Sequence, residues 1–159
     1  MRIDILCVGS IKEEFYRQAV GEYSKRLSRY VKLGIYEAKD EKTTEHASEK
    51  EIQMVLKAEA ARLEKYLVPS AYLIALAIEG TTFTSESFSK KLCDLETGGK
   101  SHLQFMIGGS LGIDEDLKKK ADLSLSFSQM TFPHQLMRVV LLEQIYRAYK
   151  IKNNEPYHK

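Results

Sequence analysis

The sequence predicts an α/β fold, in which a mostly parallel sheet carries helices on both faces of a single domain spanning residues 1–159. Segments with the apolar patterns of strands alternate with segments of helical periodicity along the whole chain, about five of each. The run AYLIALAIEG (71–80) is apolar without alternation, as expected for a parallel strand covered on both faces. With 43% hydrophobic and 29% charged residues, the composition is that of a globular protein.

The first half of the chain predicts two strands and two helices before that central strand. MRIDILCVG (1–9) and VKLGIYEA (31–38) have the apolar content of strands. Between them lies an amphipathic helix, on whose apolar face Phe15, Ala19, Tyr23, Leu27 and Tyr30 recur. A second helix follows and is stopped by Pro69. Its core face is expected to comprise Ile52, Val55, Leu56, Ala60, Leu63 and Leu67.

The second half continues the alternation. A helix over residues 84–99 opens with cap-forming hydroxyls and closes on two glycines. HLQFMIGG (102–109) predicts a strand, DEDLKKK (114–120) a short helix, and ADLSLSFSQ (121–129) a further strand. The last helix, FPHQLMRVVLLEQIYRAYK (132–150), has Pro133 near its first position, where proline is tolerated.

Apolar residues cover well over half of the circumference of that last helix. Helices of α/β domains usually lie on the outside of the sheet, so a second apolar face needs a cover. A partner subunit is the simplest one, and we therefore expect a homodimer. The alternative is a central helix that is wrapped by its own chain.

Composition narrows the class of protein further. No apolar run approaches the roughly 20 residues that cross a bilayer, and the first ten residues lack the sections of a signal peptide, so we expect a cytoplasmic protein without a membrane segment. Cys7 and Cys93 lie in apolar patterns without the spacing of a metal or redox motif, which predicts buried thiols and no metal. The net charge is only +2, but the stretch from Arg138 onward is locally basic, which suits either a solvated helix face or an anionic partner.

The glycine-rich loop FMIGGSLGID (105–114) invites comparison with phosphate-binding loops. Ser110 stands where G-x-G-x-x-G requires its second glycine, and no G-K-[ST] follows. Two further loops, IEGTTFTS after Ala77 and SQMTFPH after Phe127, also follow predicted strands. Ligands of open α/β sheets bind at the carboxyl ends of the strands, so one pocket is expected to use all three loops. A simple tight turn is the alternative for the glycine loop.

Four histidines are candidates for proton transfer. His46 lies in a charged stretch and His102 begins a strand, so neither is expected in a site. His134 lies in the first turn of the last helix, beside the third loop, where it serves either the site or helix capping. The terminal pair Tyr157 and His158 is either a frayed tail or an aromatic and titratable pair suited to base stacking and proton handling.

Taken together, FMIGGSLG, LSFSQMTFPHQLMRVVLLEQIYRAYKI and the terminal PYHK, in a chain starting MRIDILCVG, closely resemble the RlmH family along essentially the whole length. The resemblance implies a SPOUT-class methyltransferase with a deep trefoil α/β knot in the carboxyl-terminal half. It implies S-adenosylmethionine as cofactor and N3 of a pseudouridine in helix 69 of 23S rRNA, within the assembled ribosome, as the methyl acceptor.

The resemblance also assigns roles to residues. The cofactor-binding set it implies is Leu76, Gly108, Phe127, Ser128, Gln129, Met130, Thr131 and Phe132. At Gly108 and Gly109 we expect glycine because a side chain would occupy the space of the cofactor. The catalytic set, for accepting the N3 proton, stabilising the base anion and stacking on the base, is His158, Tyr157, Arg138 and His134. The tail of one subunit is expected to complete the pocket of the other.

Two other functions stay open. A SPOUT enzyme acting on transfer RNA would keep the three loops without needing the terminal Tyr157 and His158. A non-catalytic ribosome-binding module would tolerate a blocked glycine loop.

Overall fold

The computed structural model describes residues 1–158, which form one five-stranded sheet and its helices. The strands are β1 (Arg2–Val8), β2 (Lys32–Ala38), β3 (Tyr72–Thr82), β4 (His102–Ile107) and β5 (Leu123–Ser126). The helices are α1 (Glu14–Leu27), α2 (Glu49–Leu63), α3 (Ser85–Thr97), α4 (Glu115–Lys118) and α5 (His134–Lys152), and a 3-10 turn, η1 (Glu64–Tyr66), follows α2. The predicted order of elements is confirmed.

The sheet has the order β2-β1-β4-β3-β5, and every neighbouring pair is parallel. Strand β1 therefore lies inside the sheet, with β4 beside it although about a hundred residues separate them in sequence (Arg2↔His102). Parallel neighbours need crossover connections, which the helices supply. The fold class is confirmed, and the trefoil knot stays a prediction.

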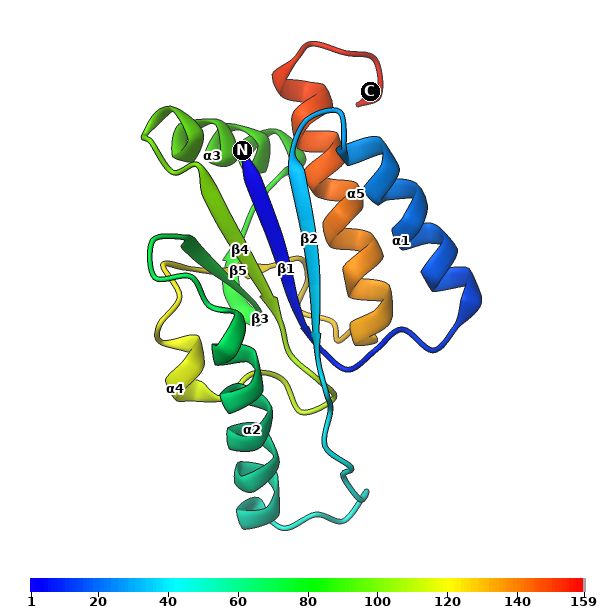
Figure 1. The fold of residues 1–159 in the computed structure, drawn as a ribbon, viewed down its shortest axis with the longest axis vertical. Helices are drawn as coiled ribbons and strands as arrows, with labels where there is room; N and C mark the ends of the chain where they lie inside the picture. Colours follow the sequence, from blue (N-terminus) through cyan, green and yellow to red (C-terminus); the bar gives the residue numbers. More distant parts are fainter. Residues whose placement is uncertain (159) are drawn as a thin grey trace.

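Alternate residues of the strands supply two cores, one on each face of the sheet. On one face, Ile3, Ile5 and Cys7 of β1 pack with α1, α3 and α5. On the other, Leu6 and Val8 pack with residues of α2 and α4. Figure 1 shows α1 and α5 side by side, and α2 at the end of the sheet where the strands point.

The two cysteines are free thiols in different surroundings. Cys7 is buried as predicted, and burial raises the pKa of its thiol to about 12, so it is inert. Cys93 of α3 is only half-buried, so the prediction of burial is wrong for this residue. It lies on the flank of the apolar stripe that Leu92 and Leu95 direct into the core.

Helix α5 is flanked by α1 and α3, and none of its residues from His134 to Ile151 is fully exposed. The last helix is thus wrapped by its own chain to a greater extent than its position on the outside of the sheet led us to expect. Six of its residues are buried, and the others up to Ile151 are half-buried. The homodimer stays a prediction.

Two differences at element boundaries affect the core and the site. Helix α2 ends at Leu63, and Leu67 lies beyond η1 instead of on the helix. Strand β3 does not end near Ala77 but continues to Thr82, because Leu76 and Thr81 both lie opposite Leu125 and the residues between them bulge out of the ladder. Gly80 makes this possible, since a Cβ there would lie 2.7 Å from the Ser124 backbone.

Candidate functional site

A pocket of about 440 Å³ lies at the carboxyl ends of β3, β4 and β5, where the three predicted loops converge. Its apolar walls include Leu76, Ile107, Leu125, Phe127 and Met137. The rest of the lining comes largely from residues of the glycine loop and of the segment before α5. A pocket of this size, mostly apolar with a few polar groups, suits a small organic ligand.

The glycine loop forms one wall, but its glycines have another reason than the predicted one. A Cβ on Gly108 would lie 2.2 Å from the Gly112 carbonyl oxygen, and one on Gly109 would lie 3.0 Å from Val8 and 3.1 Å from Glu59. The Cβ atoms would thus meet the chain itself, which is a reason for glycine that the sequence analysis did not give, and the expected conflict with the cofactor stays a prediction. Gly112 has a φ of +89°, and its N–H donates to the Gly109 carbonyl, which closes a tight turn.

The segment between β5 and α5 is held in shape by its serines. The Ser126 hydroxyl donates to the Ser128 carbonyl (3.1 Å), and the Met130 N–H donates to the Ser128 hydroxyl (3.0 Å). Met130 is 75% exposed and Phe132 is 37% exposed at the rim, an exposure that a bound ligand would reduce. Of the predicted cofactor set, Gln129 alone does not line the pocket.

The bulge in β3 adds charged groups that the sequence analysis missed. Lys118 of α4 bonds Glu79 of the bulge and Glu115 (2.6 Å). The hydrogen bond from Lys118 lowers the pKa of Glu79. Two carboxylates and one ammonium give the trio a formal net negative charge. Glu115, three residues before Lys118, was visible in the sequence, but the pairing of Lys118 with Glu79 depends on the bulge.

His134 lines the pocket at the start of α5. Its Nδ1 is buried and has no hydrogen-bond partner among the described residues. Burial, followed by the charge of Arg138, lowers the pKa of His134, which keeps the imidazole neutral at pH 7. A neutral imidazole with a free ring nitrogen can accept or donate a proton, or hydrogen-bond a ligand.

Arg138 lies one helical turn deeper and does not line the pocket. It is 1% exposed, pairs with Glu37 of β2 (2.5 Å) and donates to the carbonyl oxygens of Val8 and Gly9. Its guanidinium therefore fixes the start of α5 to the end of β1. In this chain its bonds are to protein groups, and sequence reasoning missed its partner Glu37.

The terminal pair lies away from the pocket of its own chain, on the carboxyl-terminal half of α5. The Tyr157 hydroxyl donates to Glu143 (3.0 Å), and burial raises its pKa, with hydrogen bonds to Tyr23 and Glu143 adding to the effect. His158 lies 3.3 Å from Arg147 and 2.7 Å from Glu86. The tail is thus ordered by specific contacts, and the frayed alternative is wrong through Pro156, Tyr157 and His158.

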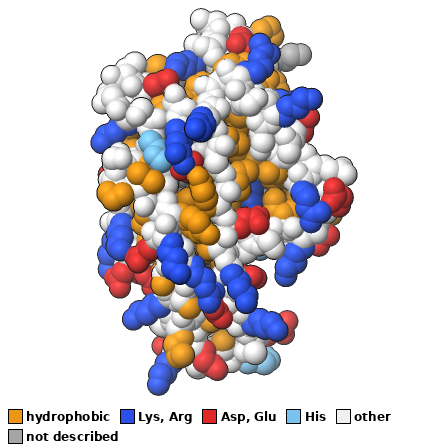
Figure 2. Space-filling model, viewed as in Figure 1, with side chains coloured by type: hydrophobic (Ala, Val, Ile, Leu, Met, Phe, Trp, Pro, Cys, Tyr) orange, Lys and Arg blue, Asp and Glu red, His pale blue; other side chains and the backbone are white. Residues whose placement is uncertain are grey.

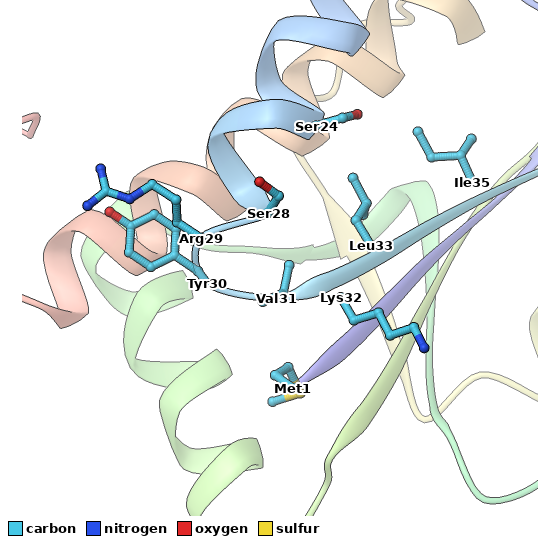
Figure 3. A pocket seen from close by; sticks show the side chains of 9 residues that line it. All are labelled: Met1, Ser24, Ser28, Arg29, Tyr30, Val31, Lys32, Leu33 and Ile35. Atoms are coloured by element: carbon cyan, nitrogen blue, oxygen red, sulfur yellow. The ribbon is translucent and has the colours of Figure 1, made fainter.

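A second hollow, of about 620 Å³, opens beside the amino end of β2 and the end of α1. Figure 3 shows Leu33, Ile35 and Val31 on one side of the strand and Lys32 on the other. Helix α1 contributes only Ser24 to the hollow, and Ser28 follows it at the helix end. No residue of the predicted site lies here, so this hollow is separate from the pocket at the carboxyl ends.

Comparison with known proteins agrees with this geometry. The sequence model of the family described as "Predicted SPOUT methyltransferase" matches residues 1–158. The chain is 57% identical over its full length to the ribosomal RNA large subunit methyltransferase H of Bifidobacterium adolescentis, and 52% identical to that of an Exiguobacterium species, with 100% of each relative covered. This chain belongs to the RlmH family of SPOUT methyltransferases.

A solved structure supports the fold of this RlmH-family chain. A probable methylase family protein from Haemophilus influenzae aligns with a TM-score of 0.53 over 99% of this chain and 70% of its own, at 12% identity. In residues 1–158, no helix is long and apolar enough to cross a membrane. The same residues contain no cluster of side chains that would hold a metal ion.

Proposed function

We propose that this RlmH-family protein transfers a methyl group from S-adenosylmethionine to N3 of pseudouridine 1915 in helix 69 of 23S rRNA, within assembled ribosomes of the cytoplasm. The supporting observation is the pocket that Leu76, Gly108 and the 127–132 segment build together at the carboxyl ends of the strands. Relatives named ribosomal RNA large subunit methyltransferase H, 52–57% identical over their full length, support the substrate class.

The pocket fits the cofactor in three respects. Its volume of about 440 Å³ lies in the range of small-molecule sites. Leu76, Phe127 and Phe132 offer apolar walls, and polar groups of Ser128 and Thr131 are proposed to meet an adenine edge. The net negative trio of Glu79, Glu115 and Lys118 complements a cofactor whose sulfonium and ammonium outnumber its carboxylate. When bound, S-adenosylmethionine supplies a methyl group already activated by the sulfonium.

The protein residues then have to orient the acceptor and handle one proton. His134 lines the pocket with a neutral imidazole, which is suited to hydrogen-bond the acceptor base or to accept its proton. Arg138 holds the helix that carries His134 and acts as a positioning residue through its bonds to Val8 and Gly9. Tyr157 and His158, which lie away from the pocket of their own chain, are proposed to serve the pocket of a partner in a homodimer.

A methyl-transfer experiment tests this function. The purified protein is incubated with S-adenosylmethionine labelled in its methyl group, together with intact 70S ribosomes, isolated large subunits or transfer RNA. We expect label in 23S rRNA at N3 of the helix 69 pseudouridine, with intact ribosomes as the best acceptor. Label in transfer RNA would favour another SPOUT activity, and binding to ribosomes without any label would favour a non-catalytic module.

A further inference from the structure

The amino-terminal half of one sheet face is not covered by a helix. Helices α2 and α4 pack against Leu6, Val8 and Met106, toward the carboxyl ends of the strands. The amino-terminal residues on the same face, Arg2, Lys32 and His102, are exposed or half-buried. In Figure 2, basic side chains and a histidine gather in the upper half of this view, beside a band of hydrophobic side chains.

These three residues form a row across three adjacent strands. Arg2 of β1 is the register partner of Lys32 of β2 on one side and of His102 of β4 on the other. Register partners of a parallel sheet project to the same face, about 4.8 Å from strand to strand. Two permanent cations and an imidazole thus stand side by side, and we call them the cation row.

The row is held in place by a buried carboxylate. Asp4 is 1% exposed and accepts a hydrogen bond from Arg2 Nε (3.1 Å), while His102 Nε2 lies 2.8 Å from its other oxygen. Gly34 makes room for it, since a Cβ there would lie 2.6 Å from the Asp4 carboxylate. Arg2 Nη2 also donates to the Tyr36 hydroxyl (2.9 Å). Within residues 1–158, Arg2 Nη1 has no hydrogen-bond partner and is available to a ligand.

The charge of this surface suits an anion. Among the described residues that β1, β2 and β4 place on this face, Asp4 is the one acid, and it is shielded beneath Arg2 and His102. Lys32 has no ion-pair partner within residues 1–158. Beside the row lie the half-buried rings of Tyr36 and Tyr66, whose centroids are 5.3 Å apart and whose planes are tilted by 37°. Aromatic side chains of this kind contact ribose and bases.

The row and the pocket lie toward opposite ends of the sheet, and strand β4 reaches from one to the other. Strand β4 has six residues, which corresponds to about 20 Å at 3.3 Å per residue. A ligand that reaches both places must be an extended polyanion and not a free nucleotide. We propose that the cation row, Lys32, Arg2 and His102, is a second docking surface for ribosomal RNA, which contacts its phosphate backbone while the target base occupies the pocket.

This inference rests on the proposed function for its choice of RNA, and its test uses binding so that the two can fail separately. The affinity of the full-length protein for 70S ribosomes is measured by cosedimentation at several salt concentrations, for the parent, Lys32→Glu and Lys32→Gln. The control is Lys90→Glu, an exposed lysine of α3 on the opposite face of the sheet that undergoes the same charge change. Affinity for S-adenosylmethionine and the oligomeric state are measured on each variant.

We expect Lys32→Glu to weaken ribosome binding about three- to tenfold, and Lys32→Gln to weaken it less. Because one phosphate contact is lost, binding releases about one counterion fewer, and the affinity should depend less steeply on salt concentration. Cofactor affinity and oligomeric state should not change, and Lys90→Glu should match the parent. Such a result supports the docking surface even if no methyl transfer is detected.

Three outcomes would overturn the inference. Equal ribosome affinity of Lys32→Glu and Lys90→Glu would show that the row does not contact RNA. Loss of dimers in Lys32→Glu would identify the surface as an interface between copies of this chain. If the parent protein does not bind ribosomes, ribosomal RNA is not the partner of this surface.

Discussion

At the scale of single residues, Gly108 has no room for a side chain, because an added Cβ would lie 2.2 Å from the Gly112 carbonyl oxygen. Gly108→Ala must therefore shift the glycine loop and with it one wall of the pocket. We expect the Kd for S-adenosylmethionine, measured by isothermal titration calorimetry, to rise about tenfold or more, as a steric conflict of about 1–3 kcal/mol implies.

A matched control is Gly21→Ala in α1, where nothing lies within 4 Å of the added methyl group. That variant should keep the parental cofactor affinity and gain about 0.5–1 kcal/mol of unfolding free energy, because alanine favours the helix. Unchanged cofactor binding in Gly108→Ala would contradict the role of the glycine loop as a pocket wall.

His134 gives a prediction about pH. Its pKa in the folded chain lies below the ordinary value of about 6.5, so the unfolded chain binds the proton more readily between the two values. Its contribution to stability is thus present above about pH 6.5 and is lost as the pH falls through the folded pKa, with a slope of at most about 1.4 kcal/mol per pH unit.

Urea unfolding of the parent and of His134→Asn at about pH 7.5 and about pH 5.5 tests this. Other groups titrate equally in both proteins, so the difference between their pH dependences isolates His134. The parent should lose more stability than the variant on acidification. Parallel pH dependences would mean that His134 is not buried in its neutral form.

At the scale of elements, the position of α5 depends on Arg138. Replacing it with methionine keeps the bulk but removes the bonds to Glu37, Val8 and Gly9. Removing one partner of a buried ion pair lowers the free energy of unfolding by several kcal/mol. Because Glu37 is 39% exposed and can rehydrate, we expect a decrease of about 2–4 kcal/mol, measured by denaturant unfolding. The single ammonium of a lysine cannot bridge the three acceptors, so Arg138→Lys should be nearly as damaging.

The control for Arg138 is Arg26→Met, which breaks an exposed pair with Glu22 on α1 and should change stability little. Equal stabilities of Arg138→Met and Arg26→Met would contradict the docking of α5 through Arg138. A loss of cofactor affinity in Arg138→Met at temperatures where it remains folded would support its action through His134.

The order and type of the elements could be predicted from periodicity, because apolar spacing depends on local geometry. The convergence of the three loops followed from a general rule for parallel sheets, and the structure places Leu76, Gly108 and Phe127 in one pocket accordingly. Two features could not be predicted, because each depends on contacts between distant segments: the pairing of Leu76 and Thr81 with one residue of β5, and the partner of Arg138. The contact that excludes a side chain at Gly108 depends on the conformation of the loop, which apolar spacing does not specify.

At the scale of the whole molecule, deletion of the tail tests catalysis separately from cofactor binding. Deleting residues 157–159 removes Tyr157 and His158 but none of the lining of the pocket. We expect the cofactor Kd to stay at the parental value while methyl transfer to ribosomes is lost. Full activity of the truncated protein would contradict a catalytic role of the tail.

Mixing chains tests whether the tail works in trans. Truncated chains keep a pocket but lack the tail, and Gly108→Trp chains keep a tail but have a blocked pocket, so each is expected to be inactive alone. Random mixing of a homodimer should restore about a quarter of the parental activity, since half of the dimers are mixed and each has one complete site. No recovery in verified mixed dimers would place the tail in the pocket of its own chain.

The register of Arg2 with His102 has a consequence for synthesis on the ribosome. Strand β1 emerges first, yet its second neighbour is made about a hundred residues later, which at about 5–20 residues per second is about 5–20 s. During that interval one edge of β1 lacks its β4 neighbour, although β2 can already pair with the other edge. The nascent chain therefore exposes an apolar strand, Ile3 to Val8, for most of its translation, and we expect its yield to depend on chaperones that shield such segments.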